Sequence, residues 1–154
     1  MPETAIRAFF EPTFECLHKI LEHLRAAESP CLPVLCGTPP PKGNNERLRD
    51  VIANEPHFVN VAEQMKVSLR EVELTTPRLR FKLWAVMQIM LQELARERGV
   101  PFIPVPTSVQ TADGFLAEDY WSEDATHANG AYGRVMLDHL SAELNLIGNP
   151  VDHG

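Results

Sequence analysis

The chain twice repeats an amphipathic helical pattern followed by a short apolar run that proline or glycine bounds. The first pattern covers residues 14–24, with Thr13 as the expected N-cap and Ser29-Pro30 as the stop, and an apolar run over residues 32–36 follows. The second runs from residue 77 to residue 99, before the apolar residues 100–105. A helix leading into a buried strand is half of a βαβ unit, so two such units predict an α/β fold with a parallel sheet.

Three further segments complete the expected order of elements. Residues 37–45 contain three consecutive prolines and predict a loop at the carboxyl end of the first strand, where it serves either as a pocket wall or as a plain connector. Residues 46–54 read as a short helix that stops before Pro56. Asn129 is the expected cap of a last helix that buries one apolar stripe, composed of Tyr132, Val135, Met136, Leu140 and Leu144.

Length and charge limit the classes of protein that the chain can belong to. At 154 residues it is expected to form a single domain, residues 1–154. A formal net charge of -7 without a basic cluster argues against nucleic-acid partners. No apolar run reaches the roughly 18 residues that span a bilayer. No basic segment followed by an apolar run is visible after Met1, so we expect no secretory leader. We therefore expect a soluble chain, cytoplasmic if Met1 is the true start.

The segment with the most chemistry is Asp124-Ala125-Thr126-His127, just before the last helix. In a Ser-His-Asp triad the acid accepts a hydrogen bond from one ring nitrogen of the histidine, and the other ring nitrogen takes the proton of the serine. An aspartate three residues before a histidine, on a turn, can supply both groups. Aspartate and threonine also cap helices, so the spacing alone leaves a structural role open.

Four blocks together resemble the SGNH or GDSL hydrolases: residues 36–41, the helix over residues 77–99, residues 102–105 and residues 120–130. The last block has the family's Asp-x-x-His form. The resemblance implies a three-layer α/β/α flavodoxin-like sandwich with a parallel sheet, in which Asp124 is the triad acid and His127 the general base. It also implies an acyl ester substrate, no cofactor and no metal. Thr38, Tyr120 and Trp121 are then candidates to line the substrate pocket.

The family's nucleophile lies in a Gly-Asp-Ser block, which this sequence does not contain. None of its serines follows an apolar strand within a glycine-aspartate turn; they are Ser29, Ser68, Ser108, Ser122 and Ser141. We therefore expect the C-terminal portion of such an enzyme, without its N-terminal strands and inactive alone. Exposed strand edges and helix faces would then favour self-association or pairing with the missing segment.

The residues leave three alternatives open. Cys36 ends a strand and could act as a thiol nucleophile, although cysteine is usually buried, as we expect for Cys16, Cys31 and Cys36. Zinc could bind His127 and Asp124, although no third ligand is spaced near them. The third alternative is a non-catalytic α/β module that binds a ligand or partner and keeps the terminal motif for helix capping.

Overall fold

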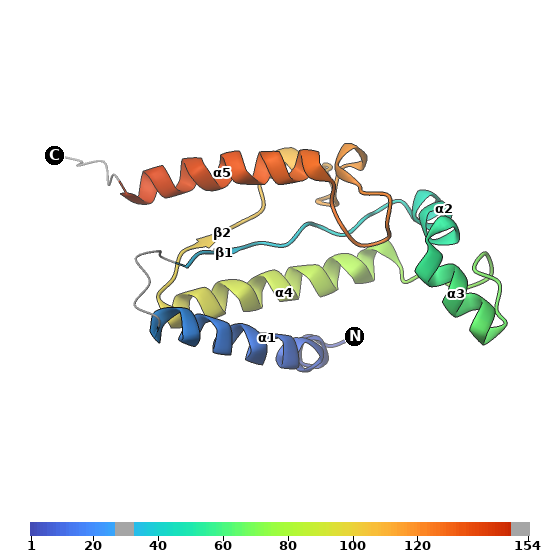
Figure 1. Cartoon of the computed structure of the whole chain (residues 1–154), viewed down its shortest axis with the longest axis horizontal. Coiled ribbons are helices and arrows are strands. Elements are labelled where there is room, and N and C mark those ends of the chain that lie inside the picture. The colour runs from blue at the N-terminus through green and yellow to red at the C-terminus, as the bar shows by residue number, and fades with distance from the viewer. Residues whose placement is uncertain (27–32, 149–154) are drawn as a thin grey trace. The chain divides into compact units, whose positions relative to one another are not determined.

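The structure is a computed structural model that describes residues 1–26 and 33–148 (Figure 1). These residues form five α-helices, two 3-10 helices and one two-stranded sheet. In chain order the elements are α1 (Glu3–Ala26), β1 (Leu35–Cys36), α2 (Asn45–Asn54), α3 (Pro56–Met65), α4 (Pro77–Arg98), β2 (Phe102–Ile103), η1 (Thr107–Val109), η2 (Glu118–Tyr120) and α5 (Gly130–Gly148).

The predicted three-layer α/β/α flavodoxin-like sandwich is wrong, because the described residues are mostly helical and hold only two short strands. The strands do pair in parallel, with Leu35 opposite Phe102 and Cys36 opposite Ile103. Each strand is two residues long. Prolines at positions 33, 39, 101 and 104 flank both strands, and proline has no N–H to extend a ladder.

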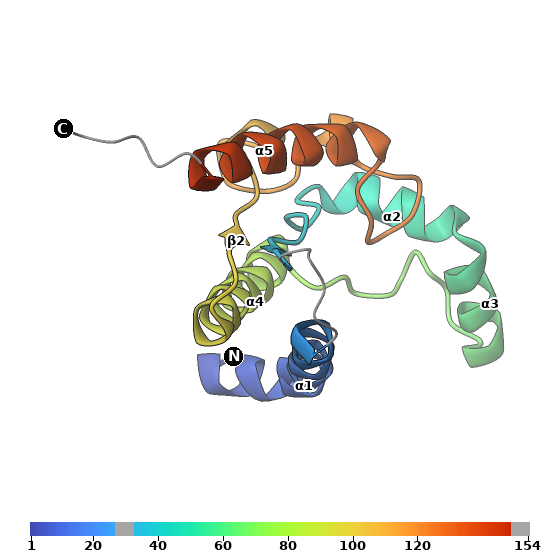
Figure 2. The ribbon, with the colours of Figure 1, turned by 60° about the vertical axis from the view of Figure 1, so that its left-hand side comes forward.

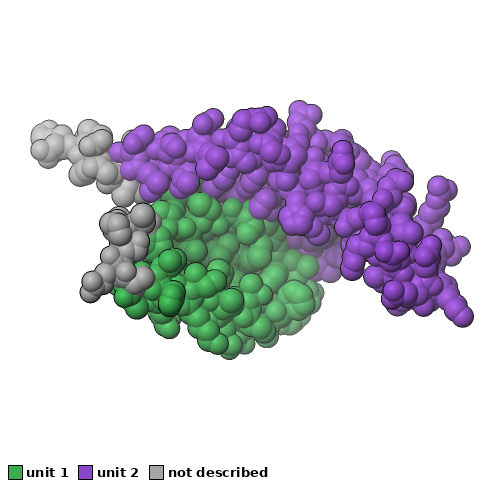
Figure 3. Space-filling view, viewed as in Figure 1, with its two compact units in different colours: residues 1–38, 82–104 green, residues 39–81, 105–154 purple. Residues whose placement is uncertain are grey.

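The chain divides into two compact units, which Figure 3 colours separately. Unit 1 comprises residues 1–38 and 82–104, and unit 2 comprises residues 39–81 and 105–154. Compactness does not show that either unit folds alone, so the single-domain organisation stays a prediction.

Unit 1 is built on α1 and α4, which lie side by side (Figures 1 and 2). Their apolar stripes form one core of Phe14, Leu21, Leu91 and Leu94, with Leu35 and Phe102 of the two strands packed against it. The helical spacing of these residues in the sequence is what directs them to one face. The apolar periodicity of residues 14–24 therefore predicts the burial of Phe14 and Leu21 correctly, whereas Leu24 of the same pattern is exposed.

Helix α1 begins at Glu3, well before the predicted N-cap Thr13, and contains Pro12 in its interior. A proline there removes one backbone hydrogen bond and costs about 3 kcal/mol. Packing of the first turns offsets this cost: Ile6 is fully buried, and Arg7 donates to both carboxylate oxygens of Glu93 at 2.7 and 3.2 Å. The predicted end at Ser29-Pro30 lies outside the described residues.

Unit 2 contains the predicted helix α2 and a second helix, α3, that the sequence did not predict. Helix α2 begins after Asn44, whose side chain accepts hydrogen bonds from the N–H groups of Glu46 and Arg47. Pro56 does end α2, but it also starts α3, since its missing N–H costs nothing in a first turn. Glu55 between the two helices is extended, as a residue before proline prefers.

Helix α5 confirms its predicted cap. The side-chain oxygen of Asn129 accepts hydrogen bonds from the N–H groups of Ala131 and Tyr132, at 2.9 and 3.1 Å. Tyr132 is buried, whereas Leu144, which we expected on the same stripe, is exposed. Because Asn129 fills the cap position, the carboxylate of Asp124 is not needed to cap this helix.

Across residues 1–26 and 33–148, no helix combines the length and the apolar character that a bilayer crossing requires. The same residues hold no cluster of three histidine, cysteine, aspartate or glutamate side chains that could bind a metal ion.

Candidate acid-base site

The Asp124 carboxylate divides its two oxygens between the backbone and the imidazole. Its Oδ1 accepts hydrogen bonds from the N–H groups of Thr126 and His127, at 2.8 and 2.7 Å. Its Oδ2 lies 2.9 Å from Nδ1 of His127. Since an ionised carboxylate only accepts, Nδ1 must carry the proton in this contact. One oxygen closes the turn, and the other sets the tautomer of the neutral ring.

The imidazole of His127 is open to solvent on its remaining side. The side chain is 79% exposed. Its Nε2 atom makes no hydrogen bond within the part of the chain that the structure describes, while Nδ1 contacts Asp124 and the Thr126 hydroxyl. When such a ring is neutral, the carboxylate holds the proton on Nδ1, and the unprotonated Nε2 can accept a proton from an incoming hydroxyl.

The charge of Asp124 is strongly stabilised. Partial desolvation raises the pKa of its carboxyl, but hydrogen bonds from the backbone N–H groups of His127 and Thr126 lower it, and contacts with the His127 and Ser122 side chains add to this effect. The net result is a pKa well below the ordinary value of 3.8. Asp124 therefore stays ionised whenever the protein is folded near neutral pH.

We expect this shift to make the stability of the protein depend on Asp124 at acid pH. Because the pKa is lower in the folded state, the unfolded chain takes up the proton first as the pH falls. The carboxylate thus stabilises the fold fully above pH 3.8, the ordinary pKa, and this contribution is lost as the pH falls toward the folded pKa. We therefore expect the free energy of unfolding to fall as the solution becomes more acidic.

Asp124→Asn should lower the free energy of unfolding at neutral pH by only about 1 kcal/mol, since the side chain is 34% exposed and solvent screens its interactions. Urea unfolding of both proteins across a pH series measures the difference. We expect the two curves to converge at acid pH. A difference that stays constant down to the lowest pH would show that the charge of Asp124 does not contribute.

The acid–base turn, residues 122–127, is closed on itself. The N–H and the hydroxyl of Ser122 both donate to the carbonyl oxygen of His127, at 3.3 and 2.8 Å. Outside the turn, Trp121 and Ala128 form an antiparallel bridge, and the side-chain amide of Asn129 donates to the carbonyl of Trp121 at 3.1 Å. These contacts hold the two ends of the turn together at the start of α5.

Two residues far away in the sequence also hold the acid–base turn. The carboxylate of Glu55, at the junction of α2 and α3, accepts a hydrogen bond from the N–H of Ala125 at 2.9 Å. Figure 2 shows the acid–base turn beside α2. The ammonium of Lys42 donates to the carbonyl oxygens of Ser122, at 3.2 Å, and of Asp124. Neither residue was predicted as part of the site, and neither lies in a recognisable motif.

Lys42 gives the proline-rich loop a role that the sequence did not reveal. Its side chain is only 4% exposed, and burial lowers its pKa, with Asp124 and Glu55 acting in the opposite direction. The glycine that follows is needed for the loop to pack, since a Cβ at Gly43 would lie 2.7 Å from Cγ of Phe115. The loop thus supports the acid–base turn.

Trp121 and Tyr120, predicted to line the substrate pocket, lie directly before the turn. Trp121 is 6% exposed, and its indole N–H donates to the carbonyl of Leu116 at 2.9 Å. The guanidinium of Arg47 lies 4.9 Å from the centroid of the indole. Trp121 is one of the residues that line a cavity of about 310 Å³. Tyr120 is half-buried, and its carbonyl accepts from the N–H of Asn129. Trp121 therefore acts chiefly in packing.

Thr38, the third predicted substrate-binding residue, belongs to unit 1, whereas Tyr120 and Trp121 belong to unit 2. Its polar groups all bond to α4. The Thr38 N–H donates to Gln88, the Gln88 amide donates back to the Thr38 hydroxyl at 2.8 Å, and the indole of Trp84 donates to the Thr38 carbonyl at 2.9 Å. These bonds give Thr38 a structural role in joining β1 to α4, and a contact with substrate stays a prediction.

The structure disfavours Ser122 and Cys36 as the nucleophile. The hydroxyl of Ser122 is engaged with the His127 carbonyl instead of the ring. Burial raises the pKa of the half-buried Cys36 thiol, the opposite of what a thiolate nucleophile needs. The expectation of buried thiols is wrong for Cys16, which is exposed, and Cys31 lies outside the described residues.

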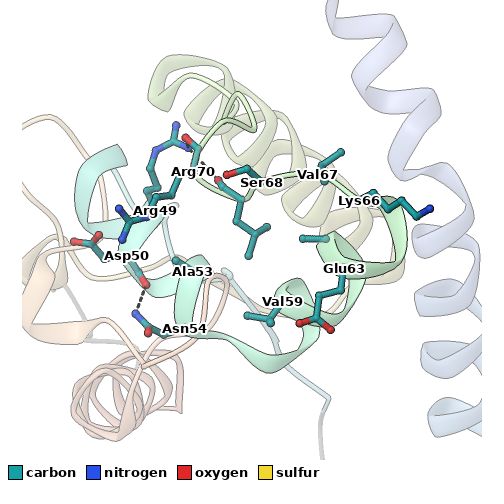
Figure 4. A pocket seen from close by; sticks show the side chains of 12 residues that line it. Arg49, Asp50, Ala53, Asn54, Val59, Glu63, Lys66, Val67, Ser68 and Arg70 are labelled. Carbon is teal, nitrogen blue, oxygen red and sulfur yellow. Dashed lines mark hydrogen bonds between the residues drawn. The ribbon is translucent and has the colours of Figure 1, made fainter.

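A further cavity lies elsewhere in unit 2, between α2, α3 and the turn that follows α3 (Figure 4). It measures about 730 Å³. Arg49 at its wall donates to the carbonyls of Leu69, Arg70 and Val72, and thereby ties the turn to α2. None of the predicted site residues lines this cavity.

No family model, no curated protein and no solved structure matches this chain.

Proposed function

We propose that Asp124 and His127 are the acid and the general base of a serine ester hydrolase of the esterase, lipase or deacylase type. The observation that carries this proposal is the division of the Asp124 carboxylate: Oδ1 fixes the turn while Oδ2 lies 2.9 Å from Nδ1 of His127. In this arrangement Nε2 makes no hydrogen bond to any residue of the ranges 1–26 and 33–148. The resemblance of residues 120–130 to the Asp-x-x-His block of the SGNH hydrolases supports the same assignment.

The chemistry follows from the two ring nitrogens. Nε2 of His127 takes the proton of a serine hydroxyl as that oxygen attacks the ester carbonyl, and the ring becomes an imidazolium. Asp124 stabilises this cation through the Nδ1–H contact and keeps its own negative charge, consistent with its lowered pKa. The imidazolium then returns the proton to the leaving alcohol, and water hydrolyses the acyl-enzyme by the same relay.

The nucleophile of the proposed enzyme comes from polypeptide outside these 154 residues. The sequence lacks a Gly-Asp-Ser block, and the serine in the turn is committed to the His127 carbonyl. The proposed substrate is an acyl ester, and the proposed partner is the segment that supplies the serine, either from the same polypeptide or from a separate chain.

A second function, a non-catalytic module that binds a ligand or partner, is favoured by one observation. Oδ1 of Asp124 closes its own turn through two backbone hydrogen bonds, and these would suffice for a structural role. In that case the contact of Oδ2 with His127 would have no consequence for chemistry.

Hydrolysis of p-nitrophenyl acetate separates the two functions. We expect this chain alone to show no burst of nitrophenol. The polypeptide that cells make from this gene, isolated with an antibody against the chain, should release about one equivalent in a burst if it carries the serine, because the acyl-enzyme forms faster than it hydrolyses. A burst from the chain alone would place the nucleophile within it. No hydrolysis by the cellular polypeptide, alone or in its native complex, would reject the esterase and leave the binding module.

A further inference from the structure

Lys42 is the one polar or charged side chain that is buried among the residues described in both units. A lysine ammonium has three N–H donors and no acceptor. Burial of such a group is unfavourable unless hydrogen bonds replace its lost hydration. The partners of Lys42 therefore indicate what the charge does in the folded protein.

Within the part of the chain that the structure describes, the hydrogen-bond and cation–π partners of the Lys42 ammonium lie in the acid–base turn and the residue before it. The ammonium donates to the carbonyl oxygens of Ser122 and Asp124. The ammonium also lies 5.3 Å from the centroid of the Trp121 indole, within the range of a cation–π contact. All the partners are thus within four consecutive residues, 121–124.

These bonds fix Asp124 from its backbone side. Lys42 holds the Asp124 carbonyl, while the carboxylate of the same residue holds the N–H groups of Thr126 and His127. Lys42 is itself anchored: its own carbonyl accepts from the guanidinium of Arg80 at 2.8 Å, and its backbone bridges to Leu116. Lys42 makes no hydrogen bond to the imidazole, so any influence on the base must pass through its two partners in the turn, Ser122 and Asp124.

We propose that Lys42 is the positioning residue of the acid–base turn, in which the buried ammonium holds the Ser122 and Asp124 carbonyls so that the Asp124 carboxylate meets Nδ1 of His127. The proposed effect of Lys42 on the structure of the turn does not depend on whether the protein is an enzyme. Its catalytic consequence rests on the proposed function.

The test uses this chain labelled with ¹⁵N and three proteins: wild type, Lys42→Met and the control Lys19→Met, which replaces an exposed lysine on α1. Methionine keeps much of the side-chain length but donates nothing. In Lys42→Met we expect the Nδ1–H tautomer of His127 to give way to the mixture of a free histidine. The amide protons of Thr126 and His127 should exchange about tenfold faster, since their bonds to Asp124 loosen. Lys19→Met should match the wild type in both measurements.

A folded Lys42→Met protein with the tautomer and the amide exchange of the wild type would overturn the proposal, because Lys42 would then only fill space. If Lys42→Met does not fold, the wild type decides the matter. In a wild-type chain that also carries a ¹³C label, scalar couplings from the Lys42 ammonium nitrogen to the carbonyl carbons of Ser122 and Asp124 are expected across the hydrogen bonds. Their absence, with rapidly exchanging ammonium protons, would also overturn the proposal.

Activity separates the two proposals. In the cellular polypeptide, Lys42→Met should lower kcat for ester hydrolysis at least tenfold with little change in KM, as expected when the general base is misplaced. If His127→Ala leaves hydrolysis intact, the proposed function fails while the tautomer result still stands. If His127→Ala abolishes hydrolysis but Lys42→Met changes neither the tautomer nor kcat, only the role of Lys42 fails.

Discussion

Replacing His127 with alanine is expected to lower kcat for ester hydrolysis by about 10⁴-fold or more, the largest effect of any substitution in this chain. Without the imidazole, no group takes the proton from the serine, and the Asp124 carboxylate has no imidazolium to stabilise. KM should change little, because the ring is mostly exposed and its polar contacts among the described residues are with Asp124 and Thr126. The measurement is steady-state hydrolysis of p-nitrophenyl acetate by the polypeptide isolated from cells.

His23→Ala is the matched control. His23 is an exposed histidine on α1, with no hydrogen bond in the described part of the chain, and its loss should leave kcat unchanged. His127→Ala should also unfold at nearly the same urea concentration as the wild type, since its ring is mostly exposed. Equal kcat values for the wild type and His127→Ala would end the esterase assignment.

Replacing Trp121 with alanine is expected to destabilise the protein by about 3–5 kcal/mol, the range for truncating a buried aromatic residue. Trp121 is 6% exposed, and its indole bonds to the Leu116 carbonyl while its ring faces the cations of Lys42 and Arg47. Truncation leaves a cavity, an unpaired carbonyl and a buried ammonium that has lost one neighbour. Urea unfolding followed by circular dichroism measures the loss.

Tyr120→Ala serves as the comparison, because Tyr120 is only half-buried and its hydroxyl makes no hydrogen bond within the described residues. We expect a loss of about 1 kcal/mol or less from it. If Trp121→Ala instead unfolded like the wild type while KM for the ester rose, Trp121 would be the substrate-binding residue that the sequence predicted.

Elements whose ends are set by local chemistry could be predicted from the sequence. Helix α4 begins at Pro77, where the Thr76 hydroxyl accepts from the N–H of Leu79, and it ends at Arg98 before Gly99, which has a φ of 62°. Helix α5 follows its predicted cap Asn129. A cap and its helix are adjacent in sequence, so the pattern contains all the information needed.

Elements that depend on distant contacts could not be predicted. The sequence predicts a helix that starts at Thr13, yet α1 begins at Glu3 and runs through Pro12 because Ile6 and Arg7 find partners in the folded unit. Pro56 was interpreted only as a stop, although proline also starts helices, and α3 was missed. The prediction of a three-layer sandwich is wrong for a related reason. Apolar runs indicate burial, but the prolines around β1 and β2 limit both strands to two residues.

In the candidate site, too, the local contact could be predicted from the sequence and the distant contacts could not. The spacing of Asp124 and His127 predicts their contact, because three residues of a turn bring the carboxylate to the ring. Lys42 and Glu55 reach the turn from 82 and 70 residues away, and a lysine among prolines carries no signal of such a partner. The pair could therefore be predicted, but the residues that hold it in place could not.

The tautomer of His127 tests the central claim most directly, since a general base needs Nδ1–H toward Asp124 and a free Nε2. Long-range ¹H–¹⁵N spectra of the ring, recorded on this chain with the imidazole neutral, assign the proton. We predict it on Nδ1 in the wild type and on Nε2 in Asp124→Asn, whose amide can donate to Nδ1. A wild-type ring with its proton on Nε2, unchanged by Asp124→Asn, would contradict the assignment of Asp124 and His127 as an acid–base pair.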